Sequence, residues 1–254
     1  MALALAVGAY AWWQYSHSGH KLLPDLVAVP ARDIKVERSA TSTLLYFSTT
    51  YYNAGEGPLE LRFDKVAQAE GDTERDVDQR IYMEDGTYVE RPVGRYVWEA
   101  EHQHFHFEDF VGYSLENIDT GTVYPGDKAT FCVRDVSRVE IDLPARSQKG
   151  PYVSCARGVQ GSSVGWGDTY YYDYPGQTID ISALPSGRYR MYTRVNPDGL
   201  FKEITRENNT SYTEFVYDAA VATTSDMTEY PVDIPTIDYT RLNDPFGILP
   251  DHHE

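Results

Sequence analysis

The feature that most constrains the fold is a seven-residue segment, residues 101–107 (EHQHFHF), in which histidine recurs at every second position. Side chains two residues apart lie on the same face of a β-strand, roughly 6.6–7 Å apart. The imidazoles of His102, His104 and His106 are therefore predicted to share one face. Phe105 and Phe107 would point to the opposite face and anchor the strand in a core.

Three imidazoles on one face predict a metal site. Histidine nitrogens bind zinc at about 2.0–2.1 Å, and imidazole also suits copper, iron and nickel. A polar surface strand that carries histidine without function is the alternative, and three histidines in register favour the metal. We predict His102, His104 and His106 as ligands, with copper and zinc both open on these residues alone.

The charge balance excludes one class of partner. Acidic residues outnumber basic residues 39 to 22, which gives a net charge of −17. Phosphate binding needs a basic face, so nucleic acid is not an expected partner. An acidic surface attracts cationic proteins or amines, although solubility or a high-salt habitat would explain the same composition.

Short alternating segments between turns predict the fold class. With 21 Tyr, 19 Gly and 14 Pro in 254 residues, the chain is expected to be all-β, an antiparallel β-sandwich-like single domain with long loops and little helix. Residues 53–58 are predicted to close a hairpin, and the glycine-rich residues 158–170 to form a loop anchored by Trp166. A strong turn is expected at residues 196–199. The predicted strands are residues 42–52, 59–63, 79–82, 94–98, 101–115, 128–133, 178–181, 188–195 and 211–217.

The two ends of the chain are set apart from the folded region at residues 21–217. Residues 1–20 contain an apolar run at 2–13, which is too short to span a bilayer and lacks the positive residues of a signal peptide. We interpret it as a signal or anchor remnant, which would allow N-terminal membrane association. Residues 218–254 are expected to be an extended or disordered tail.

The two cysteines, Cys132 and Cys155, leave two alternatives open. They form a disulfide worth about 3–4 kcal/mol in the chain-entropy model, or they are two free buried thiols. Export from the cytoplasm would favour the bond.

Six separate motifs occur in order along residues 22–217. They are LPDL at 23–26, HQHFH at 102–106, KATFC at 128–132, GWGDTY at 165–170, IDI at 179–181 and NP at 196–197. Together these motifs resemble the catalytic domain of lysyl oxidases, and the microbial branch in particular because only two cysteines are present.

The resemblance implies a secreted or cell-envelope copper amine oxidase. In this family the three histidines bind copper. A lysine in the K-A-[ST]-F-C run and the tyrosine that ends D-T-Y form lysine tyrosylquinone, which assigns Lys128 and Tyr170 to the cofactor. The enzyme would oxidise primary amines, either peptidyl lysine or small amines, with molecular oxygen, and release aldehyde, ammonia and hydrogen peroxide. Asp168, two residues from Tyr170, is a candidate for the proton-abstracting base, with a structural role as its alternative.

Some observations favour other classes. Animal members have a cysteine where this chain has Glu101, so the disulfide framework must differ. Residues 179–217 also look like the strand pairs of immunoglobulin-like adhesion modules, which allows a catalytically silent binding protein. A zinc hydrolytic or hydratase site on three histidines is a further alternative, but it gives Lys128 and Tyr170 no task.

Overall fold

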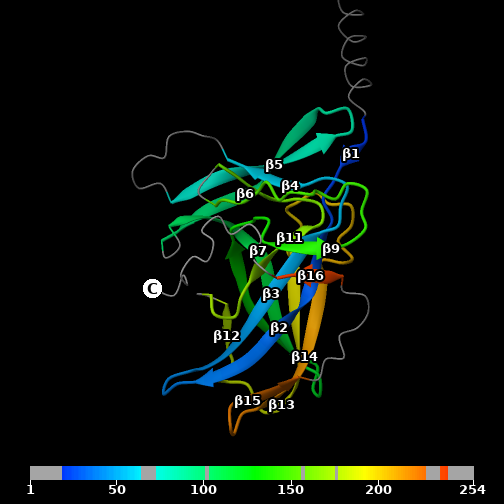
Figure 1. The fold of residues 1–254 in the computed structure, drawn as a ribbon. Coiled ribbons are helices and arrows are strands. Elements are labelled where there is room, and N and C mark those ends of the chain that lie inside the picture. Colours follow the sequence, from blue (N-terminus) through cyan, green and yellow to red (C-terminus); the bar gives the residue numbers. More distant parts are fainter. Residues whose placement is uncertain are drawn as a thin grey trace, which may run out of the picture.

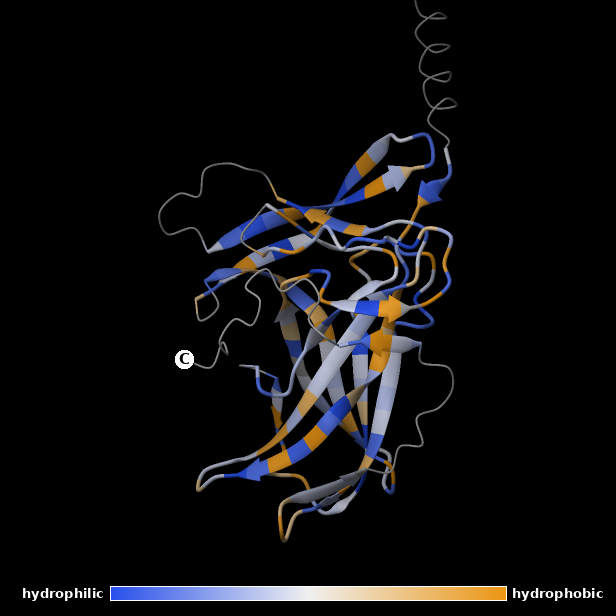
Figure 2. Cartoon of the chain, in the orientation of Figure 1, coloured by the Kyte–Doolittle hydropathy of each residue, from blue (hydrophilic) through white to orange (hydrophobic). Residues whose placement is uncertain are grey.

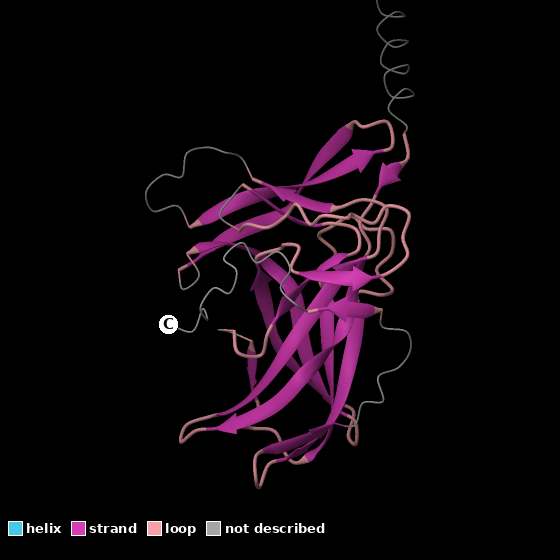
Figure 3. Ribbon diagram, viewed as in Figure 1, coloured by secondary structure: helices cyan, strands magenta, loops and turns pink. Residues whose placement is uncertain are grey.

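The computed structural model describes residues 19–63, 73–100, 103–155, 158–174, 177–226 and 235–239. These residues form two β-sheets that pack on each other, and none of them is helical (Figures 1 and 3). The predicted all-β, antiparallel sandwich-like single domain is confirmed. A search of the described ranges for a helix able to cross a membrane finds none. The apolar run at residues 2–13 and His102 lie outside the described residues.

The first sheet has ten strands and carries the histidine segment near its middle. The strand order is β10-β4-β5-β6-β7-β13-β14-β15, with β1 paired to β5 and β8 paired to β7. The predicted continuation of the histidine strand is confirmed, because β7 runs on to Asn117. The strands are β1 (Lys21–Leu22), β4 (Leu59–Arg62), β5 (Glu74–Met83), β6 (Tyr88–Glu99), β7 (His104–Asn117), β8 (Thr122–Phe131), β10 (Val159–Ser162), β13 (Gly187–Val195), β14 (Thr210–Asp218) and β15 (Thr223–Asp226).

The second sheet has six strands and covers one face of the first (Figure 1). Its order is β12-β3-β11-β9-β16, with β2 on the other edge of β3. The strands are β2 (Leu26–Arg38), β3 (Thr43–Asn53), β9 (Ser137–Glu140), β11 (Trp166–Tyr170), β12 (Thr178–Asp180) and β16 (Thr236–Asp238).

Aromatic and aliphatic side chains from both sheets form one main core. Phe105 and Phe107 belong to it and are 6% and 0% exposed, as the alternation of residues 101–107 predicts. Polar and apolar residues also follow one another in the second half of β2, residues 32–38 (Figure 2). Period-two patterning therefore sets which face of each strand is buried.

The predicted hairpin at residues 53–58 is wrong. β3 pairs within the second sheet and β4 within the first, so the segment between them crosses from one sheet to the other. The buried side chain of Asn53 holds this crossover: its Oδ1 accepts the N–H of Gly55 at 2.9 Å, and its Nδ2 donates to the carbonyl oxygens of Gly57 and Ser162 at 3.0 Å. Turn composition alone does not distinguish a hairpin from such a crossover.

The glycine-rich residues 158–170 do not form one loop, which corrects a second prediction. Strands β10 and β11 occupy its two ends, and only residues 163–165 connect them. Gly165 adopts a φ of +78°, in the left-handed region that glycine enters without penalty. Trp166 is 3% exposed and its Nε1 donates to the carbonyl oxygen of Ser147 at 3.0 Å, which confirms its predicted packing role.

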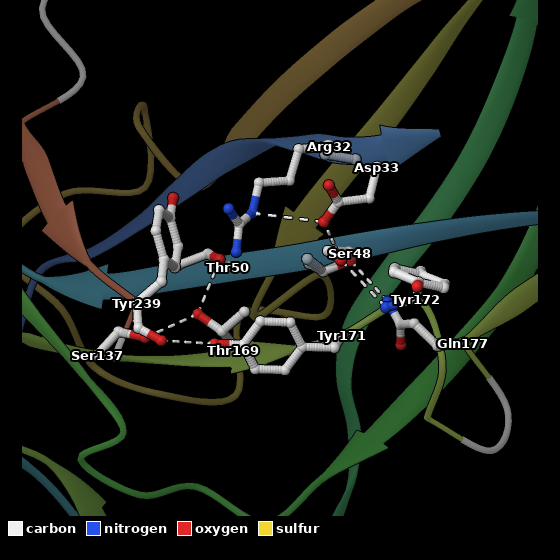
Figure 4. A network of polar contacts seen from close by, with 12 residues as sticks. Arg32, Asp33, Ser48, Thr50, Ser137, Thr169, Tyr171, Tyr172, Gln177 and Tyr239 are labelled. Carbon is white, nitrogen blue, oxygen red and sulfur yellow. Dashed lines mark hydrogen bonds and ion pairs between the residues drawn. The ribbon is translucent and has the colours of Figure 1, made fainter. Parts of the chain in front are cut away.

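A polar network fixes β11 on the face opposite Tyr170 (Figure 4). The hydroxyl of Thr169, a residue that is 1% exposed, lies 3.0 Å from that of Thr50 and 2.9 Å from that of Ser137. Because side chains alternate along a strand, these bonds leave Tyr170 directed toward the first sheet. The strand that carries Tyr170 is therefore held by buried hydrogen bonds from two neighbouring strands.

Two short strands lie within residues 218–254. β15 pairs with β14, and β16 pairs with β9. Beside β16, the guanidinium of Arg32 lies 3.5 Å from the ring centroid of Tyr239, whose carbonyl oxygen accepts the Tyr171 hydroxyl at 2.9 Å (Figure 4). These contacts seat residues 235–239 on the second sheet.

Candidate metal and tyrosine site

Strand β7 places two of the three predicted metal ligands side by side. The Nε2 atoms of His104 and His106 lie 2.9 Å apart, and His106 is 2% exposed. Two nitrogens bound at 2.0–2.1 Å to one tetrahedral ion would lie roughly 3.3 Å apart. The pair is therefore within a few tenths of an ångström of the spacing that a shared ion requires. His102, the third predicted ligand, lies outside the described residues.

Thr130 on the neighbouring strand β8 orients His106. Its Oγ1 lies 3.1 Å from Nδ1 of His106. A hydrogen bond to the second ring nitrogen fixes the orientation and tautomer of a histidine ligand. Sequence reasoning missed Thr130, although its place two residues after Lys128 in the KATFC run signals a shared face.

Tyr170 lies beside His106 although it belongs to the other sheet. The two ring centroids are 6.4 Å apart with the ring planes at 81°. The Tyr170 ring stacks on Phe131 at 3.7 Å, and its hydroxyl accepts the backbone N–H of Cys132 at 2.8 Å. Burial raises the pKa of Tyr170 well above its ordinary value, and the nearby charge of Asp168 raises it further. The phenol is thus held in one orientation and stays protonated at neutral pH.

Cys132 and Cys155 form a disulfide, with Cα atoms 5.7 Å apart, which settles the choice between a bond and free thiols. The two sulfur atoms and a ring nitrogen of His104 all lie within 4.8 Å of one another. Disulfide sulfurs lack the thiolate charge that makes cysteine a metal ligand, so we assign the bond a structural role. It tethers the segment that donates to Tyr170.

Two buried carboxylates lie in the same region, and burial raises the pKa of each to about 7. Asp135 is fully buried and accepts the N–H and hydroxyl of Ser163 and the N–H of Tyr152, at 2.8–3.2 Å. Asp168 is 1% exposed, and its Oδ2 has no hydrogen-bond partner among the described residues. A carboxyl group that titrates near neutrality is suited to proton transfer. Asp135 was not anticipated, and no sequence motif distinguishes it.

Lys128 does not lie at Tyr170 in this structure. Its Nζ lies 2.6 Å from Oδ2 of Asp198 and 3.1 Å from Oδ2 of Asp109, and its side chain is 42% exposed. These carboxylates, Asp198 first, raise the pKa of Lys128. The amine is therefore held at the surface as an ammonium ion.

A bulge and a turn bring the two carboxylates to Lys128. The register between β7 and β8 shifts between Phe107 and Val111, and Asp109 within this bulge adopts a φ of +55°. Bulges of this kind redirect side chains. Asp198 lies in the predicted turn at residues 196–199, which a backbone hydrogen bond of 3.0 Å closes. Neither acid was predicted as a functional residue.

The predicted bond between Lys128 and Tyr170 would require local movement. The Tyr170 hydroxyl lies at the backbone nitrogen of Cys132, four residues after Lys128. Extended chain rises 3.2–3.4 Å per residue, so the Cα atoms of Lys128 and Cys132 lie roughly 13 Å apart. A lysine side chain of five bonds reaches only about 6 Å from its Cα. The Lys128 amine therefore does not reach the Tyr170 ring from its present position.

Comparison with known proteins identifies the family of this chain. The sequence model of the lysyl oxidase family matches residues 79–227, which is more than half of the chain. The chain is 34% identical to protein-lysine 6-oxidase of Sus scrofa over 56% of its own length and 55% of that protein. It is 34% identical to lysyl oxidase homolog 2 of Gallus gallus over 48% of its length and 15% of that protein. It is 33% identical to lysyl oxidase homolog 4 of Homo sapiens over 48% of its length and 16% of that protein.

The fold is an antiparallel β-sandwich in which a pair of alternating histidines lies beside a half-buried tyrosine. This arrangement defines a class of protein with a candidate metal centre and an oxidisable side chain. This chain belongs to the lysyl oxidase family. It spans about half the length of the Sus scrofa relative and less than a fifth of the two homologs.

Proposed function

We propose that the protein is a copper-dependent amine oxidase. It would convert primary amines, either peptidyl lysine or small amines, to aldehydes with release of ammonia and hydrogen peroxide. The observation that carries the proposal is the position of His106, which adjoins both His104 and Tyr170. Family membership supports the same activity, and one relative is named a protein-lysine 6-oxidase.

His102, His104 and His106 are the proposed copper ligands. The convergent Nε2 atoms and the hydrogen bond to Nδ1 of His106 fit an imidazole-bound metal. Imidazole suits copper and zinc alike, so the choice of copper follows from the family. When bound, copper and the quinone made from Lys128 and Tyr170 would supply the redox chemistry, with molecular oxygen as electron acceptor.

The protein's own residues would present and deprotonate the phenol. Phe131 covers one face of Tyr170, and the N–H of Cys132 binds its oxygen, so the ring has little freedom to turn. Because the pKa of Tyr170 is raised, its proton needs an acceptor. Asp168, with a pKa of about 7 and on the same strand, is the proposed acceptor. The same carboxylate is our candidate base for the proton on the carbon next to the substrate nitrogen.

Lys128 would act as the nucleophile that adds to the Tyr170 ring, once molecular oxygen had oxidised that ring to an electrophilic quinone. Only a neutral amine can attack, so Lys128 must first lose its proton. It must also leave Asp109 and Asp198, which hold it at the surface. Formation of the cofactor would therefore begin with the opening of these two ion pairs.

The proposed substrates and location follow from charge and redox state. A net charge of −17 favours cationic proteins or amines over nucleic acid. The disulfide is the form that an oxidising, extracytoplasmic compartment maintains. We therefore propose a secreted or cell-envelope protein. The apolar run at residues 2–13 would allow it to associate with a membrane through its N-terminal segment.

A zinc hydrolytic site is the second candidate. It is favoured by the ion pairs that hold Lys128 away from Tyr170, since hydrolysis needs no bond between these residues. Three histidine ligands would leave an open position for water.

The experiment is to express the full chain with copper in air, digest it, and search by mass spectrometry for a peptide that links Lys128 to Tyr170. Hydrogen peroxide release on addition of a primary amine is the companion assay. Lys128→Arg and Tyr170→Phe should abolish both signals, whereas Tyr172→Phe, a matched change two residues away, should preserve them. Unlinked Lys128 and Tyr170 in fully copper-loaded, aerated protein would refute the oxidase. Bound zinc without quinone absorbance would support the second candidate.

A further inference from the structure

A cavity of about 510 Å³ lies apart from the histidines and Tyr170. It forms where the segment before β4, the end of β5 and the chain around Tyr152 meet. Among the described residues, none that lines this cavity belongs to the proposed catalytic site. The lining residues are Leu22, Glu56, Gly57, Pro58, Tyr82, Met83, Glu84, Gly86, Ala145, Ser147, Tyr152, Ser163 and Val164.

Two tyrosine rings form fixed walls of this cavity. The hydroxyls of Tyr82 and Tyr152 both donate to Oε2 of Glu60, at 2.9 and 2.7 Å. Glu60 is 5% exposed and its other oxygen accepts from Arg62 at 2.8 Å. Because both hydroxyls share one buried acceptor, the two rings are oriented before any ligand arrives.

The remaining lining combines apolar, acidic and small polar residues. Leu22, Met83 and Val164 supply apolar surface, whereas Glu56 and Glu84 are exposed carboxylates. Glu56 lies 2.6 Å from His20, and the described residues that line the cavity include no lysine or arginine. The cavity thus combines aromatic walls with negative charge, a combination that attracts cations.

We propose that this cavity binds the alkylammonium end of a lysine side chain, free or methylated, carried by a partner peptide. The positive group would lie against the rings of Tyr82 and Tyr152 and near the carboxylates of Glu56 and Glu84, and the alkyl stem would pack on the apolar residues. An anionic side chain would meet two like charges. A neutral side chain of the same length would gain only the apolar contacts. The proposal does not depend on the oxidase activity.

The test is calorimetric titration of the full-length, chelator-treated protein at low salt with short, otherwise neutral peptides. The three peptides carry one lysine, one trimethyllysine or one norleucine. Trimethyllysine keeps the charge but cannot be oxidised as a primary amine, so its binding is independent of catalysis. The lysine and trimethyllysine peptides should bind roughly tenfold more tightly than the norleucine peptide, the difference expected of a desolvated cation–π contact.

Glu56→Gln and Glu84→Gln should each weaken binding of the charged peptides several-fold and leave norleucine binding unchanged. Both residues are exposed, so the variants are expected to fold. Glu37→Gln, which removes an exposed carboxylate on β2, should behave as wild type. Equal affinity for lysine and norleucine peptides would overturn the proposal. It would also be overturned if all three glutamine variants bound the charged peptides alike.

Discussion

The ammonium group of Lys128, on β8, lies 2.6 Å from Oδ2 of Asp198. Cys132, directly after the same strand, donates its backbone N–H to the Tyr170 hydroxyl. Two residues expected to become joined are held apart by this ion pair. The same contact favours the protonated amine, which is the form that cannot attack a ring. In the proposed oxidase, the release of Lys128 is therefore a step of maturation that the protein itself controls.

Removal of both carboxylates that hold Lys128 should accelerate crosslinking. We expect the double variant Asp109→Asn/Asp198→Asn to form the Lys128–Tyr170 bond several-fold faster than wild type after copper is added, because Lys128 is no longer held as an ion pair. Mass spectrometry over time measures the rate. Asp119→Asn, which breaks an exposed pair with Arg188, is the matched control. A rate equal to or below that of wild type would contradict the proposed restraint.

Loss of the Thr130 hydroxyl should weaken metal binding without removal of a ligand. Thr130→Val keeps the shape of the side chain but not its hydrogen bond to His106. Groups that orient a histidine ligand typically contribute 10–100-fold to metal affinity, so we expect a loss of about that size. Competition with a chelator measures it. Thr130→Ser should retain the affinity, and an unaffected Thr130→Val would show that the ring needs no such support.

The disulfide should contribute measurably to stability. The two cysteines are 23 residues apart, and closing a loop of this length is worth about 3.5 kcal/mol in the chain-entropy model. Cys132→Ser/Cys155→Ser should lower the free energy of unfolding in urea by about that amount. Wild-type protein unfolded under reducing conditions should show a similar loss. A change below about 1 kcal/mol would mean that the denatured chain is already restrained near these residues.

The buried carboxyl of Asp168 should make stability depend on pH. Its pKa is raised to about 7 in the folded protein from an ordinary value of 3.8, so the folded state binds more protons between these pH values. Stability should therefore fall as the pH rises from about 4 to 7. Asp168→Asn should remove part of this slope, an effect on the order of a few kcal/mol. Urea unfolding at pH 4.5 and pH 8 measures it, and identical slopes in both proteins would show that Asp168 titrates normally.

The sequence predicts the parts of the fold that depend on local alternation. His104, Phe105 and His106 lie on their expected faces because the period of a strand is two wherever its pairing is regular. Tyr170 is assigned from the resemblance of the D-T-Y triplet to the lysyl oxidase motif, and the structure places it beside His106. The histidine prediction rests on local strand geometry, whereas the Tyr170 prediction rests on the family resemblance.

Long-range contacts determine the features of the fold and of the site that the sequence did not predict. Asn53 turns an expected hairpin into a crossover through bonds to distant carbonyl groups. The bulge at Asp109 follows from the register between β7 and β8, and Asp198 arrives from a turn that follows β13. The surroundings of Lys128 are therefore assembled from three separate parts of the chain, and no local pattern encodes them.

Lys128 stands on β8 of the first sheet, and Tyr170 stands on β11 of the second. A bond between them would join the two sheets covalently. It would persist in denaturant and with the disulfide reduced, and it would restrict the unfolded chain as a disulfide does. An oxidase that matures in this way would acquire its chemical reactivity and its mechanical durability in the same event.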